Sequence, residues 1–140
     1  MVDSVTPELR SDIMSRIRAK DTRPEMIVRR MLHKAGYRYR LHVRKLPGTP
    51  DLVFPARKKV IFVHGCFWHM HAGCEFARIP KTRVEFWTTK LMANKARDDK
   101  NLAALRAAGW DVLTIWECEL RQSGLLNVLT QFLECGSQER

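Results

Sequence analysis

Hydrophobic residues follow two patterns along this chain, one helical and one strand-like. Apolar positions three or four residues apart share one face of a helix, whereas alternating or short continuous apolar runs are typical of strands. The patterns predict the order helix, helix, three strands, helix, strand, helix, which favours a single α/β domain with a sheet covered by helices. The predicted helices are 7–19, 23–35, 84–108 and 120–133, and the predicted strands are 37–43, 51–54, 59–63 and 110–116.

Residues at the expected element boundaries support these ranges. Thr22 and Glu25 have the spacing of a capping box, and Pro24 lies in the first turn, where its missing N–H costs no hydrogen bond. Gly36 and Gly109 are suited to end the helices that precede them. The second helix is therefore expected to begin near residue 23.

The strands predicted at 51–54 and 59–63 are close in sequence and separated by a turn. A turn at 47–50 precedes the strand 51–54, and a further turn at 55–58 leads into the apolar run 59–63. These two strands are expected to form a hairpin, which would place Asp51 near the end of the second strand. The strand 37–43 has one apolar or aromatic face and one cationic face, and the latter carries Arg38, Arg40, His42 and Arg44.

Composition narrows the class of partner. The 140 residues contain 25 Lys and Arg against 15 Asp and Glu, a net charge of +10, which makes a polyanion and above all a nucleic acid the leading partner. A role of the charge in solubility or in binding an anionic membrane surface stays open. No apolar stretch approaches the roughly 18 residues of a membrane span, and the first residues lack a signal-peptide pattern, so a cytoplasmic protein is expected.

Cysteines and histidines concentrate in the loop-like stretch 64–83. Cys66, Cys74, one of His69 or His71, and the distant Cys118 would supply the thiolate and imidazole ligands of a closed, structural zinc site. The alternative is a set of separate buried cysteines beside a surface histidine pair. Cys135 is left without a role.

A second group is acidic and scattered in sequence. Glu25, Asp51 and Asp98, with His64 and His69, could provide the carboxylates and the acid or base that metal-dependent phosphodiester hydrolysis needs. Each carboxylate also has a simpler explanation. Glu25 fits a helix cap, Asp51 a turn, and Asp98 a solvated charge run.

Aromatic residues stand among basic ones near the same loop. Phe67 and Trp68 lie in a polar, glycine-flanked stretch, and Trp87 lies near the start of the long predicted helix beside Arg83 and Lys90. Such side chains could wedge between base steps while cations contact phosphates, although core packing is their commonest role.

A group of motifs extends from about residue 14 to Cys118. The most specific is the run 62–69, Phe-Val-His-Gly-Cys-Phe-Trp-His. The other members are 21–25, 46–51, 83–87, 94–98 and 109–118. In order and spacing they resemble the very-short-patch repair DNA mismatch endonucleases, and together they are far more specific than an isolated zinc-ligand pattern.

The resemblance implies a restriction-endonuclease-like fold with a structural zinc site. It also implies Mg2+-dependent, strand-specific nicking of double-stranded DNA at T:G mismatches, which begins repair of deaminated 5-methylcytosine. The expected enzyme is a bacterial-type, nucleoid-associated monomer without a membrane partner, and other mismatch-repair proteins are further candidate partners. The expected organisation is a DNA-gripping arm or helix at 1–20, an endonuclease domain at 21–135 and a tail at 136–140.

Individual catalytic residues are also implied by the resemblance. Asp51 matches the carboxylate that binds Mg2+, and the backbone carbonyl of Val63 matches the other direct protein ligand, although Val stands where Thr is expected. His64 and Asp98 match a pair that orients metal-bound water. His69 matches a general acid or base, and Glu25 matches the carboxylate that supports it.

The resemblance further assigns the zinc and DNA-binding residues. It selects His71 over His69 as a zinc ligand, with one extra residue between His71 and Cys74. The implied zinc ligands are Cys66, His71, Cys74 and Cys118. The implied DNA-binding residues are Phe67, Trp68 and Trp87, which enter the duplex, and Met14 and Ile17 in the arm.

Two other functions stay open at this point. A restriction-type nuclease of the same fold would cut matched DNA, and a non-catalytic zinc-containing module would bind DNA without cutting it. Equal nicking of mismatched and matched duplexes would indicate the restriction-type nuclease. The binding module predicts no effect of replacing Asp51, whereas the enzyme predicts lost nicking with retained binding.

Overall fold

The computed structural model describes residues 22–74 and 77–135. The predicted helix at 7–19, the arm with Met14 and Ile17, and the tail at 136–140 lie outside these residues. The described elements are α2 (Arg23–Lys34), β1 (Arg40–Leu41), β2 (Leu52–Phe54), η1 (Pro55–Arg57), β3 (Lys59–His64), α3 (Val84–Ala107), β4 (Asp111–Trp116), η3 (Glu117–Arg121) and α4 (Leu125–Glu134). Their order confirms the predicted α/β class.

The sheet is mixed and has the strand order β1-β2-β3-β4. β2 runs antiparallel to both β1 and β3, so the predicted hairpin of β2 and β3 is confirmed. β3 and β4 are parallel and stay in register over six residue pairs, from Lys59 beside Asp111 to His64 beside Trp116. The carboxyl ends of these two strands therefore meet at one edge of the sheet.

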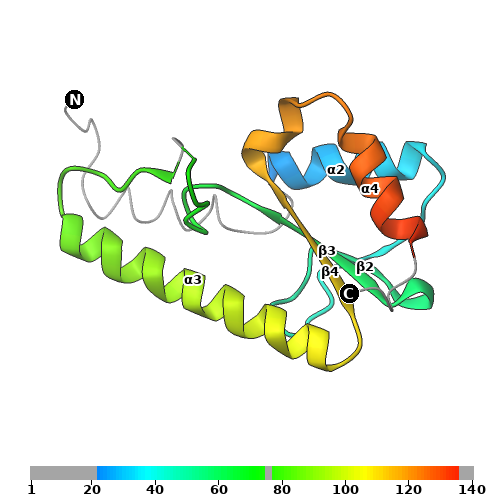
Figure 1. The fold of residues 1–140 in the computed structure, drawn as a ribbon, viewed down its shortest axis with the longest axis horizontal. Coiled ribbons are helices and arrows are strands. Elements are labelled where there is room, and N and C mark those ends of the chain that lie inside the picture. Colours follow the sequence, from blue (N-terminus) through cyan, green and yellow to red (C-terminus); the bar gives the residue numbers. More distant parts are fainter. Residues whose placement is uncertain (1–21, 75–76, 136–140) are drawn as a thin grey trace.

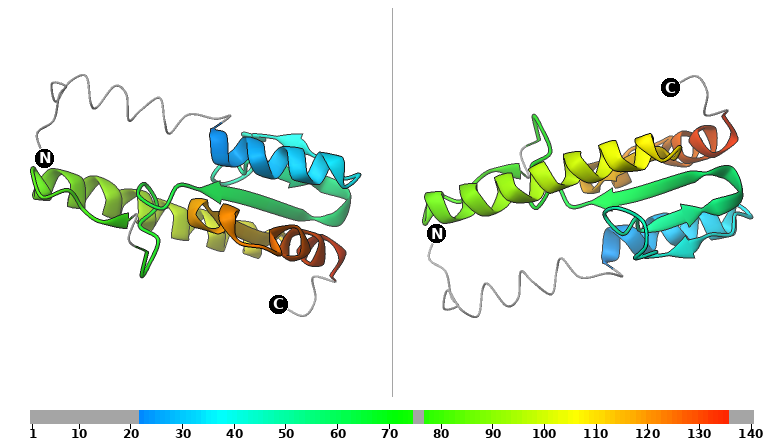
Figure 2. Two further views of the ribbon diagram at one scale, coloured as in Figure 1. Left: turned by 90° about the horizontal axis from the view of Figure 1, so that it is seen from above. Right: turned by 90° about the horizontal axis from the view of Figure 1, so that it is seen from below.

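Helices cover both faces of the sheet, with α2 and α4 on one side and α3 on the other (Figure 1). Figure 2 shows the same elements from above and below. Leu52 and Ile61 belong to the core that also contains the buried side chains of α2 and α4. Phe62 points to the opposite face and packs in a cluster with Leu105 of α3. Alternation along β3 thus places consecutive residues in different cores, as expected for a strand buried on both faces.

The first half of α3 extends past the sheet, beneath the loop that follows β3 (Figure 1). There Trp87 and Leu91 form a separate small core with Trp68 of that loop. The buried Asn94 amide also donates to the Trp68 carbonyl oxygen at 3.4 Å. The loop carrying the predicted site residues is therefore attached to α3 by packing and by a hydrogen bond.

Two predicted elements are shorter than expected. The alternation at 37–43 predicted a long strand, but β1 ends at Leu41 because His42 adopts a left-handed conformation, with φ 49°. The last helix begins at Leu125 instead of residue 120, since residues 117–121 form a 3-10 turn in which the Glu119 carboxylate accepts the Trp116 N–H at 2.8 Å. The predicted α2 is confirmed, including its Thr22 cap.

A buried lysine fixes the end of α4 to the start of β3. The Lys59 ammonium donates to the carbonyl oxygens of Phe132 and Cys135 and lies 3.6 Å from an Asp111 carboxylate oxygen. A cation is favourable at the C-terminal end of a helix, where carbonyl groups lack helical partners. Among the described residues, none of the helices has the length and hydrophobicity to cross a bilayer.

The small core between α3 and the loop is expected to contribute measurably to stability. Leu91 is fully buried, whereas its neighbour Met92 is 57% exposed. Leu91→Ala should lower the free energy of unfolding in urea by about 2–5 kcal/mol, because it leaves a cavity. Met92→Ala is the matched control and should change it by no more than about 0.5 kcal/mol. Equal effects of the two substitutions would contradict this description of the core.

Candidate active site and metal centre

A cleft with a volume of about 1130 Å³ opens at the carboxyl end of β3. It is bounded by the start of α2, the segment that leads into β2, the loop after β3 and the middle of α3. Both signs of charge line it, so it can accommodate phosphates and a cation together. The charged lining residues are Glu25, Arg29, Arg44, Asp51, Arg97, Asp98 and Glu117.

The turn before β2 places Asp51 in this cleft. The N–H of Thr49 donates to the carbonyl oxygen of Leu46 at 3.0 Å, which closes the turn. Gly48 has a positive φ of 77°, and a Cβ at this position would lie 3.1 Å from the Phe62 ring, so glycine suits both the backbone and the packing. Beyond the turn, one Asp51 carboxylate oxygen accepts the N–H of Val63 at 2.7 Å.

Asp51 belongs to a group of three with Glu25 and His42, whose candidate ligand atoms lie within 4.8 Å of one another. The His42 Nε2 atom is 2.7 Å from a Glu25 carboxylate oxygen and 4.0 Å from one of Asp51. Burial raises the pKa of Asp51 to about 7, and the nearby Glu25 charge adds to this, while the Val63 N–H opposes it. A bound cation would favour the ionised carboxylate.

The second group contains His64, His69 and Asp98, also with candidate ligand atoms within 4.8 Å of one another. The two imidazole rings stack with centroids 3.7 Å apart and planes within 5° of parallel. Asp98 on α3 is hydrogen-bonded to Nδ1 of His69. Burial lowers the pKa of His64 to about 3, with a further contribution from His69, so the His64 ring is neutral near pH 7.

The two groups lie on either side of the end of β3. Val63 packs in the core shared with α2 and α4, whereas His64, the next residue, lines a small pocket with Thr114 and with residues of α3. Glu25 comes from α2 and Asp98 from α3, on opposite faces of the sheet (Figure 1). The cleft therefore brings carboxylates from both helical layers to the end of one strand.

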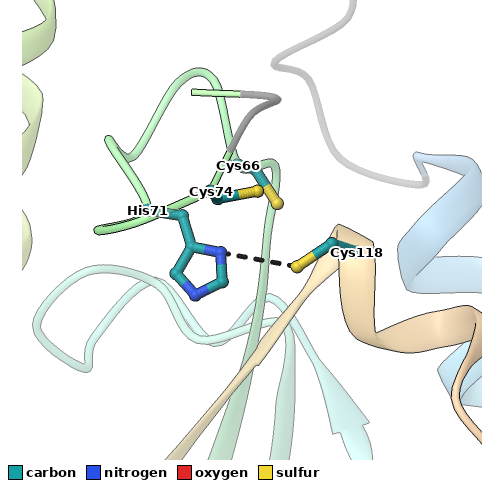
Figure 3. A group of neighbouring side chains, drawn as sticks. All are labelled: Cys66, His71, Cys74 and Cys118. Atoms are coloured by element: carbon teal, nitrogen blue, oxygen red, sulfur yellow. Dashed lines mark hydrogen bonds between the residues drawn. The ribbon is translucent and has the colours of Figure 1, made fainter. Parts of the chain in front are cut away.

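A third group combines Cys66, His71, Cys74 and Cys118 within the same 4.8 Å limit. Figure 3 shows three of these side chains coming from the loop and Cys118 from the segment after β4. Nδ1 of His71 lies 3.5 Å from the Cys118 sulfur, and the ring stacks on Trp116 with centroids 4.1 Å apart. The extra residue before Cys74 does not prevent the four side chains from converging.

The chemistry of this third group suits zinc. Three sulfurs and one imidazole nitrogen make the closed ligand set of structural zinc sites. Burial raises the pKa of the Cys66 thiol to about 12 and also raises that of Cys118, so thiolates in this position require a compensating cation. Cys135 is exposed and lies outside the group.

The predicted DNA-binding aromatics form one cluster. Trp68 and Trp87 are 7% and 5% exposed, with ring centroids 6.1 Å apart, so most of their surface is packed within the protein. Phe67 is half-buried and contacts both tryptophans edge to face. Phe67 and Trp68 also line the cleft, whereas the neighbouring Phe86 is 39% exposed on α3.

Two features of the cleft were not singled out from the sequence. His42 was predicted only as part of a cationic strand face, because nothing in the alternation distinguished it from its arginine neighbours. Asn94 and Arg97 are joined by a 3.0 Å hydrogen bond and line the cleft together. Their spacing of three residues on a predicted helix was the available signal.

Comparison with known proteins agrees with this arrangement. Residues 2–75, more than half of the chain, match the family model described as DNA mismatch endonuclease Vsr. The chain belongs to this family. Vsr-family members are DNA endonucleases, so the prediction of an enzyme that acts on DNA is confirmed.

Individual Vsr relatives extend the likeness over nearly the whole chain. The type II nicking enzyme V.XorIIP of Xanthomonas oryzae is 53% identical over 126 residues, covering 90% of this chain and 92% of that protein. The type II nicking enzyme V.NmeAIP of Neisseria meningitidis is 41% identical, covering 89% of each. The DNA mismatch endonuclease Vsr of Escherichia coli is 40% identical, covering 97% of this chain and 90% of that protein.

The raised pKa of Asp51 predicts a pH-dependent effect of one substitution in protein without added Mg2+. The folded protein holds the Asp51 proton up to about pH 7, whereas the unfolded chain releases it near pH 4. The contribution of Asp51 to the free energy of unfolding is therefore complete below pH 4 and is lost as the pH rises through 7. Asp51→Asn keeps a neutral side chain throughout. It should therefore raise the free energy of unfolding by roughly 2–4 kcal/mol at pH 8 and change it little at pH 4.

The control for this measurement is Asp99→Asn, which replaces an exposed carboxylate on α3. Urea unfolding at both pH values should show no comparable gain for this variant. A gain for Asp51→Asn that is the same at pH 4 and pH 8 would contradict the proposed role of burial.

Proposed function

We propose that this protein nicks one strand of double-stranded DNA at T:G mismatches that arise from deaminated 5-methylcytosine, with Mg2+ as cofactor. The observation that carries the proposal is the pair of side-chain groups on either side of the β3 end, within one cleft. Family membership supports strand nicking, and the relative from Escherichia coli is named a DNA mismatch endonuclease. The mixed sheet with its β3-α3-β4 unit supports a restriction-endonuclease-like fold.

The DNA backbone enters the cleft between its arginines. Arg29, Arg44 and Arg97 line the walls, and guanidinium groups contact phosphate oxygens with two parallel hydrogen bonds. The net charge of +10 adds an attraction that does not depend on sequence. The arm around Met14 and Ile17 grips the duplex from the minor groove.

The scissile phosphate lies beside Asp51. Asp51 and the Val63 carbonyl provide oxygen ligands of the kind that Mg2+ prefers. Glu25, which the resemblance assigns to the support of His69, is grouped with Asp51 instead, with candidate ligand atoms within 4.8 Å of each other, so we add its carboxylate to this cation site. When bound there, the cation withdraws negative charge from the phosphate in the transition state. The hydrogen bond from the Val63 N–H keeps the Asp51 carboxylate at the end of the strand.

Proton transfer takes place on the other side of the same phosphate. Asp98 holds Nδ1 of His69, which leaves Nε2 as the ring nitrogen that exchanges a proton with water or with the leaving oxygen. The neutral His64 ring stacks on His69 and fixes its plane. Groups on opposite sides of the phosphate suit an in-line displacement, in which the entering and leaving oxygens are opposed.

Aromatic contact selects the mismatch. Phe67, braced by Trp68 and Trp87, enters the duplex beside the mismatched pair, and a T:G pair costs less to unstack than a matched pair. The packing of the two tryptophans gives the inserted ring a rigid support. Insertion therefore needs little rearrangement of the protein.

Zinc at Cys66, His71, Cys74 and Cys118 holds this loop in place. The ion ties the loop to the end of β4, and the same loop carries Phe67 and His69. A closed set of four protein ligands leaves no open position for substrate, so this site is structural.

A nicking assay tests the proposed reaction. Duplexes of equal flanking sequence that carry either T:G or T:A at one position are incubated with the protein and Mg2+. The T:G duplex should be nicked in one strand at least about 100-fold faster, since discrimination by a few kcal/mol in unstacking corresponds to that ratio. Equal nicking of both duplexes would favour the restriction-type nuclease instead.

Two variants make the assay specific. Asp51→Ala should abolish nicking and retain binding to the T:G duplex, whereas a non-catalytic binding module would have no activity to lose. Phe67→Ala should reduce the preference for T:G over T:A more than it reduces the binding of matched DNA. Asp99→Asn, at the exposed carboxylate, should match the unsubstituted protein in nicking, in binding to the T:G duplex and in the preference for T:G over T:A.

Elemental analysis tests the zinc site. Freshly purified protein should contain one equivalent of zinc, Cys118→Ser should lose most of it, and its melting temperature should fall by several degrees. Cys135→Ser removes the exposed cysteine outside the group and should leave zinc content and melting temperature unchanged. Zinc-free purified protein, or an unaltered melting temperature in Cys118→Ser, would contradict the ligand assignment.

A further inference from the structure

We propose that Nε2 of His42 is a direct ligand, with Glu25 and Asp51, of the divalent cation in the cleft, and that it gives this site a preference for Mn2+ over Mg2+. The inference rests on the proposed cation site but goes beyond it, because a nitrogen ligand alters which metal the site retains. His42 is assigned no role by the sequence motifs.

The spacing of the donor atoms carries the proposal. Nε2 of His42 is 2.7 Å from Glu25 and 4.0 Å from Asp51, and all three candidate ligand atoms lie within 4.8 Å of one another. Ligands about 2.1 Å from one ion are separated by about 3–4 Å when adjacent, so the three atoms need only small adjustments to enclose a cation. All three residues line the cleft, which gives an ion access from solvent.

The backbone of His42 directs the ring toward this point. β1 ends at Leu41, and His42 takes a left-handed conformation with φ 49°, which is uncommon for a residue with a side chain. Its N–H donates to the carbonyl oxygen of Asp51 at 3.3 Å, so the backbones of two proposed ligands are joined. A regular strand through residue 43 would have continued the alternation and kept His42 on the cationic face.

The donor set then determines the metal preference. Mg2+ binds oxygen ligands and keeps much of its hydration, whereas Mn2+ accepts both carboxylate oxygen and imidazole nitrogen. Arg29 lies 3.4 Å from the same Glu25 oxygen that faces His42, so part of the Glu25 charge is already balanced. An imidazole nitrogen beside the two carboxylates therefore favours the ion that accepts nitrogen as well as oxygen.

The experiment measures Mn2+ directly, without DNA. Zinc-loaded protein is titrated with Mn2+ and followed by electron paramagnetic resonance, and electron spin-echo modulation detects 14N nuclei bound to the ion. We expect 14N coupling in the unsubstituted protein and its loss in His42→Gln, together with at least about tenfold weaker Mn2+ binding, since loss of even an indirect ligand partner costs about 10–100-fold. The affinity for Mg2+, measured by competition, should change by a much smaller factor.

Two control variants complete the test. His33→Gln, at an exposed histidine of α2, should keep the 14N coupling and the affinity. His69→Ala should also keep the coupling, because its ring belongs to the other group. Absence of 14N coupling in the unsubstituted protein, or its persistence in His42→Gln, would overturn the inference and show that His42 only pairs with Glu25.

The outcome is independent of the nicking assay. Mg2+-dependent nicking without 14N coupling would reject the His42 ligand and leave the proposed function intact. Coupling that depends on His42 in a protein that nicks no duplex would reject the proposed function and retain the metal site.

Discussion

The parallel pairing of β3 with β4 is the constraint on which the arrangement of this protein depends. Six residue pairs keep the strands in register, so His64 and Trp116 end beside each other. The residues that follow, Cys66 after one strand and Cys118 after the other, must then lie close in space. Strand pairing thus brings together Cys66 and Cys118, which are more than 50 residues apart in sequence. Interactions within the loop alone could not do this.

One loop serves the cysteine group and the histidine group at once. Its residues alternate between them, since Cys66 and His71 converge with the other cysteines while His69 faces Asp98. The aromatic core beneath the loop, with Trp68, fixes it to α3. A disturbance of any one of these contacts therefore displaces the others, and structural stability and cleft geometry are coupled through the backbone of the loop.

Local chemistry explains which parts could be predicted from the sequence. The Thr22 cap and the apolar run of β3 depend on neighbours in the chain, so α2 and the hairpin were predicted closely. The motif comparison supplied the convergent ligands, but the burial of Trp68 depends on α3 and was not evident from a polar loop. The left-handed turn at His42 was also missed, because alternation records hydrophobicity and contains no information about a single backbone angle.

The contacts of the buried Lys59 place the end of α4 far from the cleft. Lys59 holds the carbonyl of Cys135 at the start of β3, whereas the cleft opens at the other end of the same strand. Five residue steps along a strand separate these points by roughly 16 Å. A second DNA-binding module joined directly to Cys135 would therefore be attached at the end of β3 opposite the cleft, and its point of attachment would leave the cleft open to DNA.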